Sequence, residues 1–395
     1  MIKVIKGGEV YAPWYLGQKD ILLLGDKIGA IEDRIDLYTN LKSIIGKEVI
    51  QAKNKLVVPG LIDAHVHITG GGGEGGFKTR TPEVQLSDLI TAGITTVVGC
   101  LGTDGITRDM KGLYAKAKAL EEEGISTFIY TGSYQLPLST ITGKIEEDLI
   151  FIDKVIGVGE IALSDHRSSH PSSEELIKIA SATRLGGILS GKKAVVHFHL
   201  GSGKDHLLHI ENLTKESELP LEQFLPTHVN RTGELFEKAA DYARRGGFID
   251  LTTTTTEQFL KEGEIKASKG LKLLLEDKVL LDNITFTSDG QGSLPDYDEN
   301  GVLCGLYSGK LTSLYKSVRD AVFEEGIDLQ DVLNVVTKNP ARILGLFGKG
   351  ILRKNMDADI LIINKDDLRI ETVISGGRVM FNDGKLLVRG TFEED

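Results

Sequence analysis

"VVPGLIDAH", residues 57–65, is the first of eight short runs typical of β-strands, and these runs decide the fold. The other seven occupy residues 95–100, 127–131, 155–161, 194–199, 224–228, 248–252 and 284–288. Amphipathic stretches separate most of them, for example residues 111–124 and 233–247, and the second of these ends at a glycine. Strands that alternate with helices pair in parallel, and eight such strands close a barrel. The sequence therefore predicts the α/β class and a (β/α)8 TIM barrel.

The two ends of the chain differ from this middle part. Residues 1–55 and 350–395 contain short alternating strands between glycine and aspartate turns. Neither segment is able to bury a core alone, so we expect both termini to build one small β-sandwich domain. The barrel domain then spans residues 56–349.

Composition and charge exclude several classes of protein. The chain has 395 residues, 41% of them hydrophobic, and a net charge of −11. A nucleic-acid or anionic-membrane surface needs clustered Lys and Arg, so we expect neither partner. The first residues, "MIKVIKGGEV", show no apolar signal segment, and no apolar stretch is long enough for a membrane span. Cys100 and Cys304 have no disulfide or metal-site spacing, so we expect reduced thiols and a cytoplasmic location.

Polar side chains follow five of the predicted strands, at the end of the barrel where TIM-barrel chemistry takes place. They are His65 and His67, Glu160, His197 and His199, His228 and Arg231, and Asp289 and Ser293. A lone histidine there is more often a hydrogen-bonded core residue, and an aspartate before glycine is more often a turn or cap. Four imidazoles and two carboxylates together instead indicate a site for two metals such as zinc, manganese, iron or nickel. We expect His197, one layer deeper than His199, to pack in the core.

Charged side chains at the barrel mouth are suited to bind a substrate. The run "GGGGEGG", residues 70–76, lets the backbone approach a ligand closely, and Glu74 within it is able to bind an ammonium group. The run is not a phosphate loop, because no Gly-Lys-Ser/Thr follows it. Arg167 and Arg231 each lie just past a strand, where a guanidinium is suited to bind a carboxylate. The alternatives are a flexible loop and two surface charges.

These motifs resemble the amidohydrolase superfamily and, within it, the isoaspartyl (β-aspartyl) dipeptidases. The superfamily pattern is His-x-His after the first strand, single histidines after strands five and six, and an aspartate after strand eight. The closer resemblance covers nearly the whole chain in order. It rests on "GGGGEGGFKTRTPEV" (70–84), "GTDGITR" (102–108), "TGSYQLP" (131–137), "SDHR" (164–167), "PTHVNR" (226–231) and "SDGQGS" (288–293).

The resemblance implies a metal-dependent hydrolase that cleaves the β-aspartyl amide bond of a small dipeptide. It implies two divalent metal ions, and we expect Zn2+. The implied ligands are His65, His67 and Asp289 for one ion and His199 and His228 for the other. A hydroxide that bridges the metals would attack the carbonyl, with Asp289 as general base and then acid. Tyr134 would donate a hydrogen bond to the scissile carbonyl.

The resemblance also assigns the substrate contacts. Glu74 would bind the α-ammonium group of the dipeptide. The residues implied for its carboxylates are Arg167, Arg231, Ser293 and Thr103. Family members resemble large homo-oligomers, so we expect a homo-oligomer here, an octamer if the chain is like the family.

The sequence departs from the family at Glu160. In most members the bridging ligand on the fourth strand is a carboxylated lysine, and counting back from "SDHR" places Glu160 there. Lys154 lies too early to replace it, so we expect no carboxylated lysine and assign Glu160 as the bridging ligand. The Glu160 carboxyl is about 3–4 Å shorter in reach, at roughly 1.2 Å per bond. Strand four must then approach the metals, or the bridge is altered and one metal is bound; alternatively, Glu160 pairs with an arginine.

Two other functions stay open at this point. Another amidohydrolase, such as a hydantoinase or deacetylase, would act on a cyclic amide or N-acyl substrate and would not need Glu74, Arg167 and Arg231. A non-catalytic scaffold on this fold would have lost metal ligands, whereas every ligand position here is filled. The sequence favours the dipeptidase.

Overall fold

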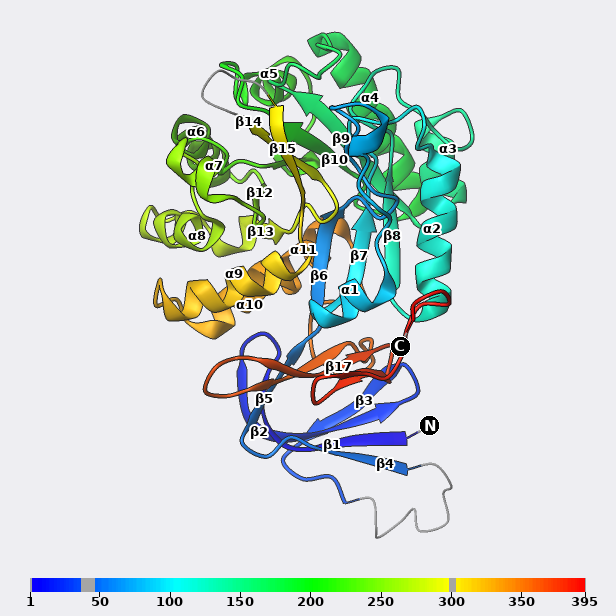
Figure 1. The fold of residues 1–395 in the computed structure, drawn as a ribbon, viewed down its shortest axis with the longest axis vertical. Coiled ribbons are helices and arrows are strands. Elements are labelled where there is room, and N and C mark those ends of the chain that lie inside the picture. Colours follow the sequence, from blue (N-terminus) through cyan, green and yellow to red (C-terminus); the bar gives the residue numbers. More distant parts are fainter. Residues whose placement is uncertain (1, 37–46, 298–302, 395) are drawn as a thin grey trace.

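Eight strands form a barrel in the computed structural model of the chain, which describes residues 2–36, 47–297 and 303–394 (Figure 1). Six of them form one parallel sheet in sequence order, and the last two form a separate parallel pair. The eight are β6 (Leu61–Val66), β7 (Ile94–Gly99), β8 (Ser126–Thr131), β9 (Val155–Leu163), β10 (Val195–Leu200), β11 (Phe224–Thr227), β12 (Ile249–Thr252) and β13 (Ile284–Thr287). A parallel bridge between Val66 and Gly290 links β6 to the loop after β13. The predicted (β/α)8 fold is confirmed.

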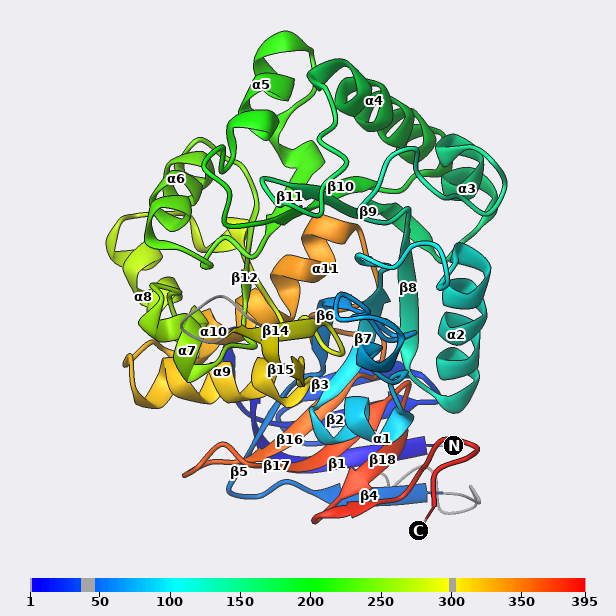
Figure 2. The ribbon, with the colours of Figure 1, turned by 45° about the horizontal axis from the view of Figure 1, so that its top comes forward.

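Helices surround the barrel strands, as the view in Figure 2 shows. They are α1 (Leu86–Thr91), α2 (Met110–Glu123), α3 (Ile145–Phe151), α4 (Ser173–Ser190), α5 (Leu208–Glu216), α6 (Gly233–Arg244), α7 (Glu257–Lys261), α8 (Ala267–Glu276), α9 (Thr312–Phe323), α10 (Leu329–Val336) and α11 (Lys338–Leu344). Two of them, α2 and α6, correspond to the helices predicted at residues 111–124 and 233–247. The side chain of Asp109 caps the start of α2, and Gly124 ends it in the left-handed conformation, with φ of 118°. No helix in the described ranges is long and apolar enough to cross a bilayer.

Strands from both termini build one sheet below the barrel (Figure 1). They are β1 (Ile2–Tyr11), β2 (Tyr15–Leu24), β3 (Lys27–Glu32), β4 (Lys47–Gln51), β5 (Lys55–Pro59), β16 (Ile360–Asn364), β17 (Ile370–Ser375), β18 (Arg378–Asn382) and β19 (Lys385–Leu386). The antiparallel pair of β5 and β16 joins the N-terminal half to the C-terminal half. Ile5, Ile21 and Ile28 share one buried cluster with Ile360 and Ile374, so the two halves cover a common core. The predicted β-sandwich from both termini is confirmed.

The first predicted strand, residues 57–65, is wrong as a single strand. The chain leaves the sandwich sheet after β5 and enters the barrel at β6, and Gly60 lies between them. The Gly60 N–H donates to Asp359 O, whereas the Leu61 N–H donates to Gly93 O. A Cβ atom at Gly60 would lie 2.2 Å from Oγ1 of Thr95, so a side chain has no room at this crossing. Hydrophobic pattern alone does not distinguish one long strand from two that change partners.

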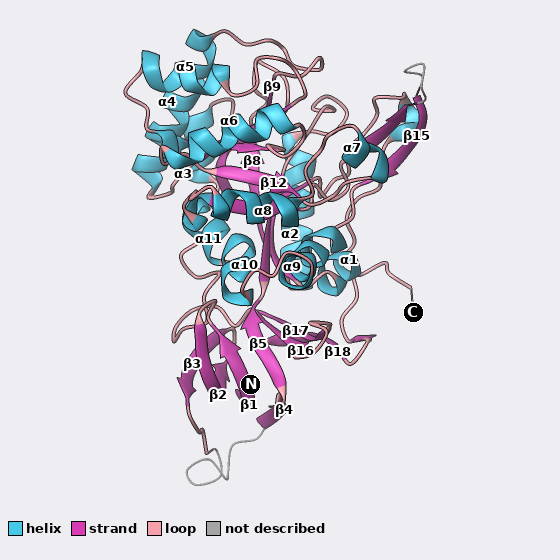
Figure 3. Ribbon diagram, turned by 90° about the vertical axis from the view of Figure 1, so that its left-hand side faces the viewer, coloured by secondary structure: helices cyan, strands magenta, loops and turns pink. Residues whose placement is uncertain are grey.

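Two further elements lie at opposite ends of the barrel. Residues of α11, such as Ile343, share a buried cluster with inward-facing Ile62 and Tyr130, so this helix packs against the barrel interior. The antiparallel hairpin of β14 (Ser293–Tyr297) and β15 (Leu303–Ser308) follows β13. Figure 3 places this hairpin at the end of the barrel away from the sandwich, beside the loops that follow the barrel strands.

Candidate active site

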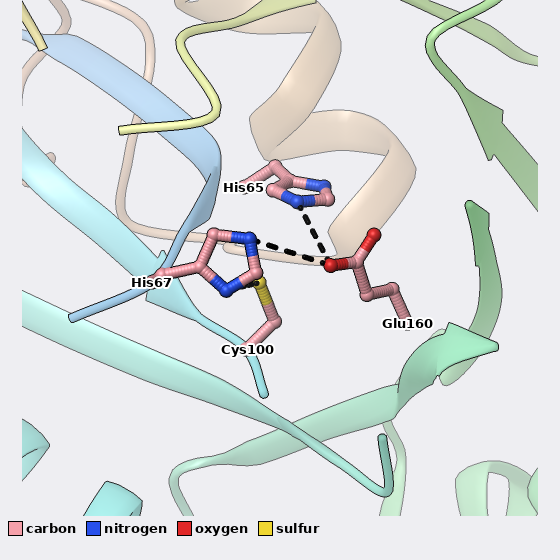
Figure 4. Close-up of side chains that lie close together, drawn as sticks. All are labelled: His65, His67, Cys100 and Glu160. Atoms are coloured by element: carbon pink, nitrogen blue, oxygen red, sulfur yellow. Dashed lines mark hydrogen bonds and ion pairs between the residues drawn. The ribbon is translucent and has the colours of Figure 1, made fainter. Parts of the chain in front are cut away.

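The first half of the site lies where β6 meets the loop after β13. His65 lies on β6 and His67 directly follows it, and the Nε2 atoms of both face Oε1 of Glu160 at 3.4 Å (Figure 4). Oδ1 of Asp289 lies 3.5 Å from His65 Nε2 and 3.1 Å from His67 Nε2. The His67 N–H donates to Gly290 O at 2.9 Å, and this bond holds Asp289 beside the histidine pair.

The second half of the site lies on the other side of the Glu160 carboxylate. Its Oε2 atom lies 3.2 Å from Nδ1 of His199 and 3.8 Å from Nε2 of His228. All three side chains are buried, and that of Glu160 is completely buried. One oxygen of Glu160 thus faces each histidine pair, which is the arrangement a bridging carboxylate requires.

A β-bulge explains how the short Glu160 side chain reaches both pairs. Val158 and Ile161 of β9 pair with Val196 and Phe198 of β10, so β9 contains one extra residue at this point. A bulge bends its strand and redirects a side chain, and bulges are over-represented next to active sites. Gly159 within the bulge has φ of 151°, and a Cβ atom there would lie 2.7 Å from His197 O. The bulge therefore brings Glu160 inward at a position where only glycine fits next to it.

The donor atoms fit divalent metal ions. Four of them are buried and make no hydrogen bond among the described residues: His65 Nε2, Glu160 Oε1, His228 Nε2 and Asp289 Oδ1. Buried polar atoms without partners are costly, and a shared cation removes that cost. The separations of 3.1–3.5 Å between Nε2 of the two histidines and the oxygens of Glu160 and Asp289 match the roughly 3.4 Å between donors of a tetrahedral ion with bonds near 2.1 Å. A second donor group consists of Glu160, His199 and His228.

Charges in this cluster depend on one another. Burial disfavours a positive charge on His65 and His67, but acidic groups packed against them outweigh burial and raise the pKa of both rings well above the ordinary value. Cys100 and Glu160 are prominent among those groups. Burial also opposes ionisation of Glu160, yet the surrounding imidazoles, first His65, hold its pKa well below the ordinary value. Despite burial, a hydrogen bond from His67 and the nearby imidazoles lower the pKa of Asp289.

Two of the histidines have a fixed partner on the side away from Glu160. His199 Nε2 lies 3.1 Å from Oδ2 of Asp165, which gives the carboxylate–histidine arrangement found at many metal sites. His228 Nδ1 lies 2.5 Å from Oγ1 of Thr252. His228, directly after β11, and Asp289, two residues after β13, both have a left-handed backbone, with φ of 61° and 52°. Such strained positions concentrate at functional sites, where neighbouring structure maintains them.

The predicted substrate contacts meet around Glu74. Its Oε1 lies 3.1 Å from NH1 of Arg167 and accepts a hydrogen bond from Thr103 Oγ1 at 3.1 Å. Its Oε2 accepts a hydrogen bond from Ser293 Oγ at 2.8 Å. Arg167 also binds both oxygens of Asp165, at 2.9 and 2.8 Å. These residues come from three loops and the start of β14, so charge pairs and hydrogen bonds organise the mouth of the barrel.

Arg231 and Tyr134 both lie next to His199. Arg231 donates to Leu200 O at 2.9 Å and lies 3.2 Å from Nε2 of His199. The hydroxyl of Tyr134 lies 2.6 Å from Nδ1 of His199. Burial and Glu160 raise the pKa of Tyr134 well above the ordinary value, so the phenol keeps its proton. The pocket has a volume of about 330 Å3, and its lining includes Glu74, Arg167, His228, Arg231, Asp289 and Ser293.

The structure brings every predicted site residue to this barrel end, and it adds two that the sequence left without a role. Asp165 connects His199 to Arg167, and its place in "SDHR" just after a strand was the available signal. Cys100 directly follows β7, with Sγ 3.9 Å from His67 Nδ1 (Figure 4), and the spacing of cysteines in the sequence gives no signal for a single thiol that meets histidines only in the fold. Lys154 lies elsewhere, since its Nζ contacts Glu121 and Thr127.

His197 occupies the buried position predicted for it. Its side chain is completely buried and does not line the pocket. Burial, and next the neighbouring His65, lower the pKa of His197 to about 3, so its ring is neutral near neutral pH. The ring nevertheless lies directly behind His65, with Nε2 of His197 2.7 Å from Nδ1 of His65.

Comparison with known proteins gives the same family for most of the chain. The model of the amidohydrolase family matches residues 56–380. A crystal structure of β-aspartyl dipeptidase from Fervidobacterium islandicum AW-1, in complex with the β-Asp-Leu dipeptide, is 46% identical over 98% of both chains, with a TM-score of 0.89. A second structure of β-aspartyl dipeptidase from this organism is 44% identical over 98% of both chains, with a TM-score of 0.88. An allantoinase from Bacillus licheniformis is 25% identical over 92% of this chain and 87% of its own length.

We predict that metal binding at this site releases protons. The pKa values of His65 and His67 lie above their ordinary value in protein stripped of metal, so a metal must displace protons from these rings. Metal affinity should therefore fall as the pH is lowered. Calorimetric titration of Zn2+ into stripped protein, in two buffers of different ionisation enthalpy, measures the number of protons released.

The raised histidine pKa also determines how the stability of the stripped protein changes with pH. A raised histidine pKa stabilises stripped protein below the unfolded value of about 6.5, and this stabilisation is lost as the pH rises through the folded pKa. The increase in melting temperature on adding Zn2+ should thus grow with pH. His166→Gln, at an exposed ring, is the control and should behave as the parent. Binding heats that are independent of the buffer would contradict the prediction.

Proposed function

The chain belongs to the amidohydrolase family, within it to the group of the β-aspartyl dipeptidases, and on that premise we propose that it is a metal-dependent dipeptidase that hydrolyses the β-aspartyl amide bond. The observation that carries this proposal is the charge network of Glu74, Arg167, Thr103 and Ser293 directly above the donor cluster. A β-aspartyl dipeptide has one ammonium and two carboxylate groups. Glu74, Arg167 and Arg231 all line one pocket, and their charges complement those three groups.

Two divalent metal ions, with zinc as the expected metal, fit the two donor groups. His65, His67 and Asp289 would hold one ion. His199 and His228 would hold the other, with Glu160 between the two ions in place of a carboxylated lysine. When bound, the metals would supply a hydroxide nucleophile at neutral pH and polarise the scissile carbonyl.

Residues of the chain would position the substrate and move the protons. Glu74 would bind the α-ammonium group, while Arg167 and Arg231 would bind the carboxylates with Ser293 and Thr103 as further donors. The lowered pKa of Asp289 keeps its carboxylate ionised, as a general base requires, and the same group would return the proton to the leaving amine.

Tyr134 would stabilise the carbonyl oxygen as negative charge develops on it. The phenol keeps its proton because its pKa is raised, and it lies next to His199. The Tyr134 hydroxyl contacts Nδ1 of His199, and this same nitrogen faces Glu160. Engagement of that nitrogen by a metal would leave the hydroxyl free to donate to the substrate.

The function is tested by hydrolysis of β-Asp-Leu against α-Asp-Leu, dihydrouracil and allantoin. We expect cleavage of β-Asp-Leu alone and its loss on addition of a chelator, with recovery on addition of Zn2+. Cleavage of a cyclic amide without cleavage of β-Asp-Leu would support a cyclic amidase instead. Chelator-resistant cleavage of β-Asp-Leu would contradict the metal-dependent mechanism.

We predict that Asp289→Asn lowers kcat on β-Asp-Leu by roughly 10²- to 10⁴-fold, because the amide cannot accept the proton. The amide oxygen still donates to a metal, so both ions should stay bound. Elemental analysis of the dialysed variant measures this, with the parent protein as control. Loss of metal would show that Asp289 acts mainly as a ligand, and one metal equivalent in the parent would contradict bridging by Glu160.

We predict that Glu74→Gln lowers kcat/KM for β-Asp-Leu roughly 30- to 1,000-fold, since removal of one partner of a desolvated charge pair costs roughly 2–4 kcal/mol. Metal content should not change, because the partners of the Glu74 carboxylate are Arg167, Thr103 and Ser293, which are not among the metal-donor residues. Glu262→Gln is the matched control, since Glu262 also lines the pocket but bonds Gln258. Equal effects of the two substitutions would show a general charge effect and would reject a specific ammonium contact.

A further inference from the structure

We propose that His197 is a positioning residue that fixes the tautomer of His65 and so keeps Nε2 of His65 free to bind a metal. This inference rests on the proposed function in one respect, namely that the donor group of His65 holds a metal ion. It adds a residue that neither the sequence nor the family pattern assigns to the site.

The hydrogen bonds of His197 determine which of its nitrogens carries the hydrogen. Nδ1 lies 2.9 Å from the backbone oxygen of Leu225, and a carbonyl oxygen only accepts hydrogen bonds. Nδ1 of His197 is therefore the donor. A neutral imidazole has one N–H group, so Nε2 of His197 is left as an acceptor.

The acceptor nitrogen of His197 determines in turn which nitrogen of His65 carries the hydrogen. Nε2 of His197 lies 2.7 Å from Nδ1 of His65, so Nδ1 of His65 must donate its hydrogen to this acceptor. The hydrogen of His65 is thereby placed on the nitrogen away from Glu160 and Asp289. In the neutral ring that binds a metal, the lone pair is therefore on the other nitrogen, Nε2, which faces both carboxylates.

Packing holds the His197 ring in the orientation that this chain of bonds requires. The ring stacks on Tyr130, with centroids 4.8 Å apart and planes 22° apart. Tyr130 is itself anchored, because its hydroxyl donates to Ala64 O at 3.2 Å. His197 and His199 lie two residues apart on β10, so one strand supplies a ligand to one donor group and the support for a ligand in the other.

A metal-binding histidine usually donates its second N–H to a carboxylate, a backbone carbonyl or water, and loss of that partner typically lowers metal affinity about 10- to 100-fold. Here the backbone carbonyl of Leu225 acts through an intervening imidazole. The hydrogen bond that supports His65 therefore depends on the His197 side chain, and a substitution at His197 can remove it.

His197→Asn and His197→Gln form a matched pair of amide variants. The shorter Asn amide reaches the Nδ1 position and keeps the bond to Leu225, but it does not reach His65. The longer Gln amide places an acceptor at the Nε2 position and keeps the bond from His65. Tyr130→Phe controls for altered packing, since it removes only the bond to Ala64.

Zn2+ affinity and content of the stripped and reloaded proteins are measured by competition with a chromophoric chelator. We expect His197→Asn to lower the Zn2+ affinity of one of the two metal sites about 10- to 100-fold. We expect His197→Gln and Tyr130→Phe to bind as the parent does. Two-bond 15N–1H NMR spectra of zinc-loaded protein should show the Nδ1–H tautomer of His65 in the parent and in His197→Gln.

Equal zinc affinities for His197→Asn and His197→Gln, whether both normal or both weakened, would overturn the inference. An Nε2–H tautomer of His65 in the zinc-loaded parent would do the same. Failure of the proposed function is distinguishable, because it would show in the parent protein as intact β-Asp-Leu, whereas this inference is judged on zinc binding and tautomer alone.

Discussion

The buried carboxylate of Glu160 is the constraint on which the rest of the site depends. An ionised carboxylate away from water costs several kcal/mol unless positive charge and hydrogen-bond donors surround it. Glu160 has histidine nitrogens on both sides and no exposed surface. Its short side chain requires the bulge in β9, and the bulge requires Gly159, because a side chain there would meet His197. One carboxylate thus determines a strand irregularity, a glycine and the spacing of two donor groups.

At the mouth of the barrel, opposite charges already satisfy one another before a substrate binds. Glu74 pairs with Arg167, and Arg167 pairs with Asp165. A ligand with only one charge would break a pair and leave its partner unpaired, which costs more than a single contact returns. A ligand with an ammonium and carboxylates can replace both sides of a broken pair. If the chain hydrolyses β-aspartyl dipeptides as proposed, the network would discriminate by the arrangement of charges in the ligand, because uncharged cyclic amides lack the groups that would compensate.

Much of the fold and the set of donor residues could be predicted from the sequence, because both follow from local pattern. Strands read as short apolar runs, and the histidines and acids follow directly after them. What could not be predicted depends on register and on partners distant in sequence. Gly60 divides one apolar run between two sheets, and the bulge at Glu160 has no signature in composition. Asp165 and Cys100 acquire their place only when β9 and β7 bring them beside histidines from other strands.

Closure of the barrel and assembly of the site depend on the same interactions. Among the described residues, the β12–β13 pair is joined to the other barrel strands largely by side chains and one isolated bridge, not by a continuous ladder. The Asn230 amide donates to Thr252 O at 3.0 Å and accepts from Thr252 N–H at 2.9 Å, so it connects the loop after β11 to β12. Across the other gap, Ser288 N donates to Asp63 at 3.2 Å.

Both connections lie next to proposed metal ligands, Asn230 two residues after His228 and Ser288 directly before Asp289. Below them, the threonines of β11 and β13 donate to the buried carboxylate of Asp250 on β12, and burial raises the pKa of Asp250 to about 6. Polar side chains in a barrel interior cost desolvation energy, but here their bonds replace missing ladder bonds. The site is therefore not added to a finished barrel, because the residues that orient His228 and Asp289 also hold the last two strands in place.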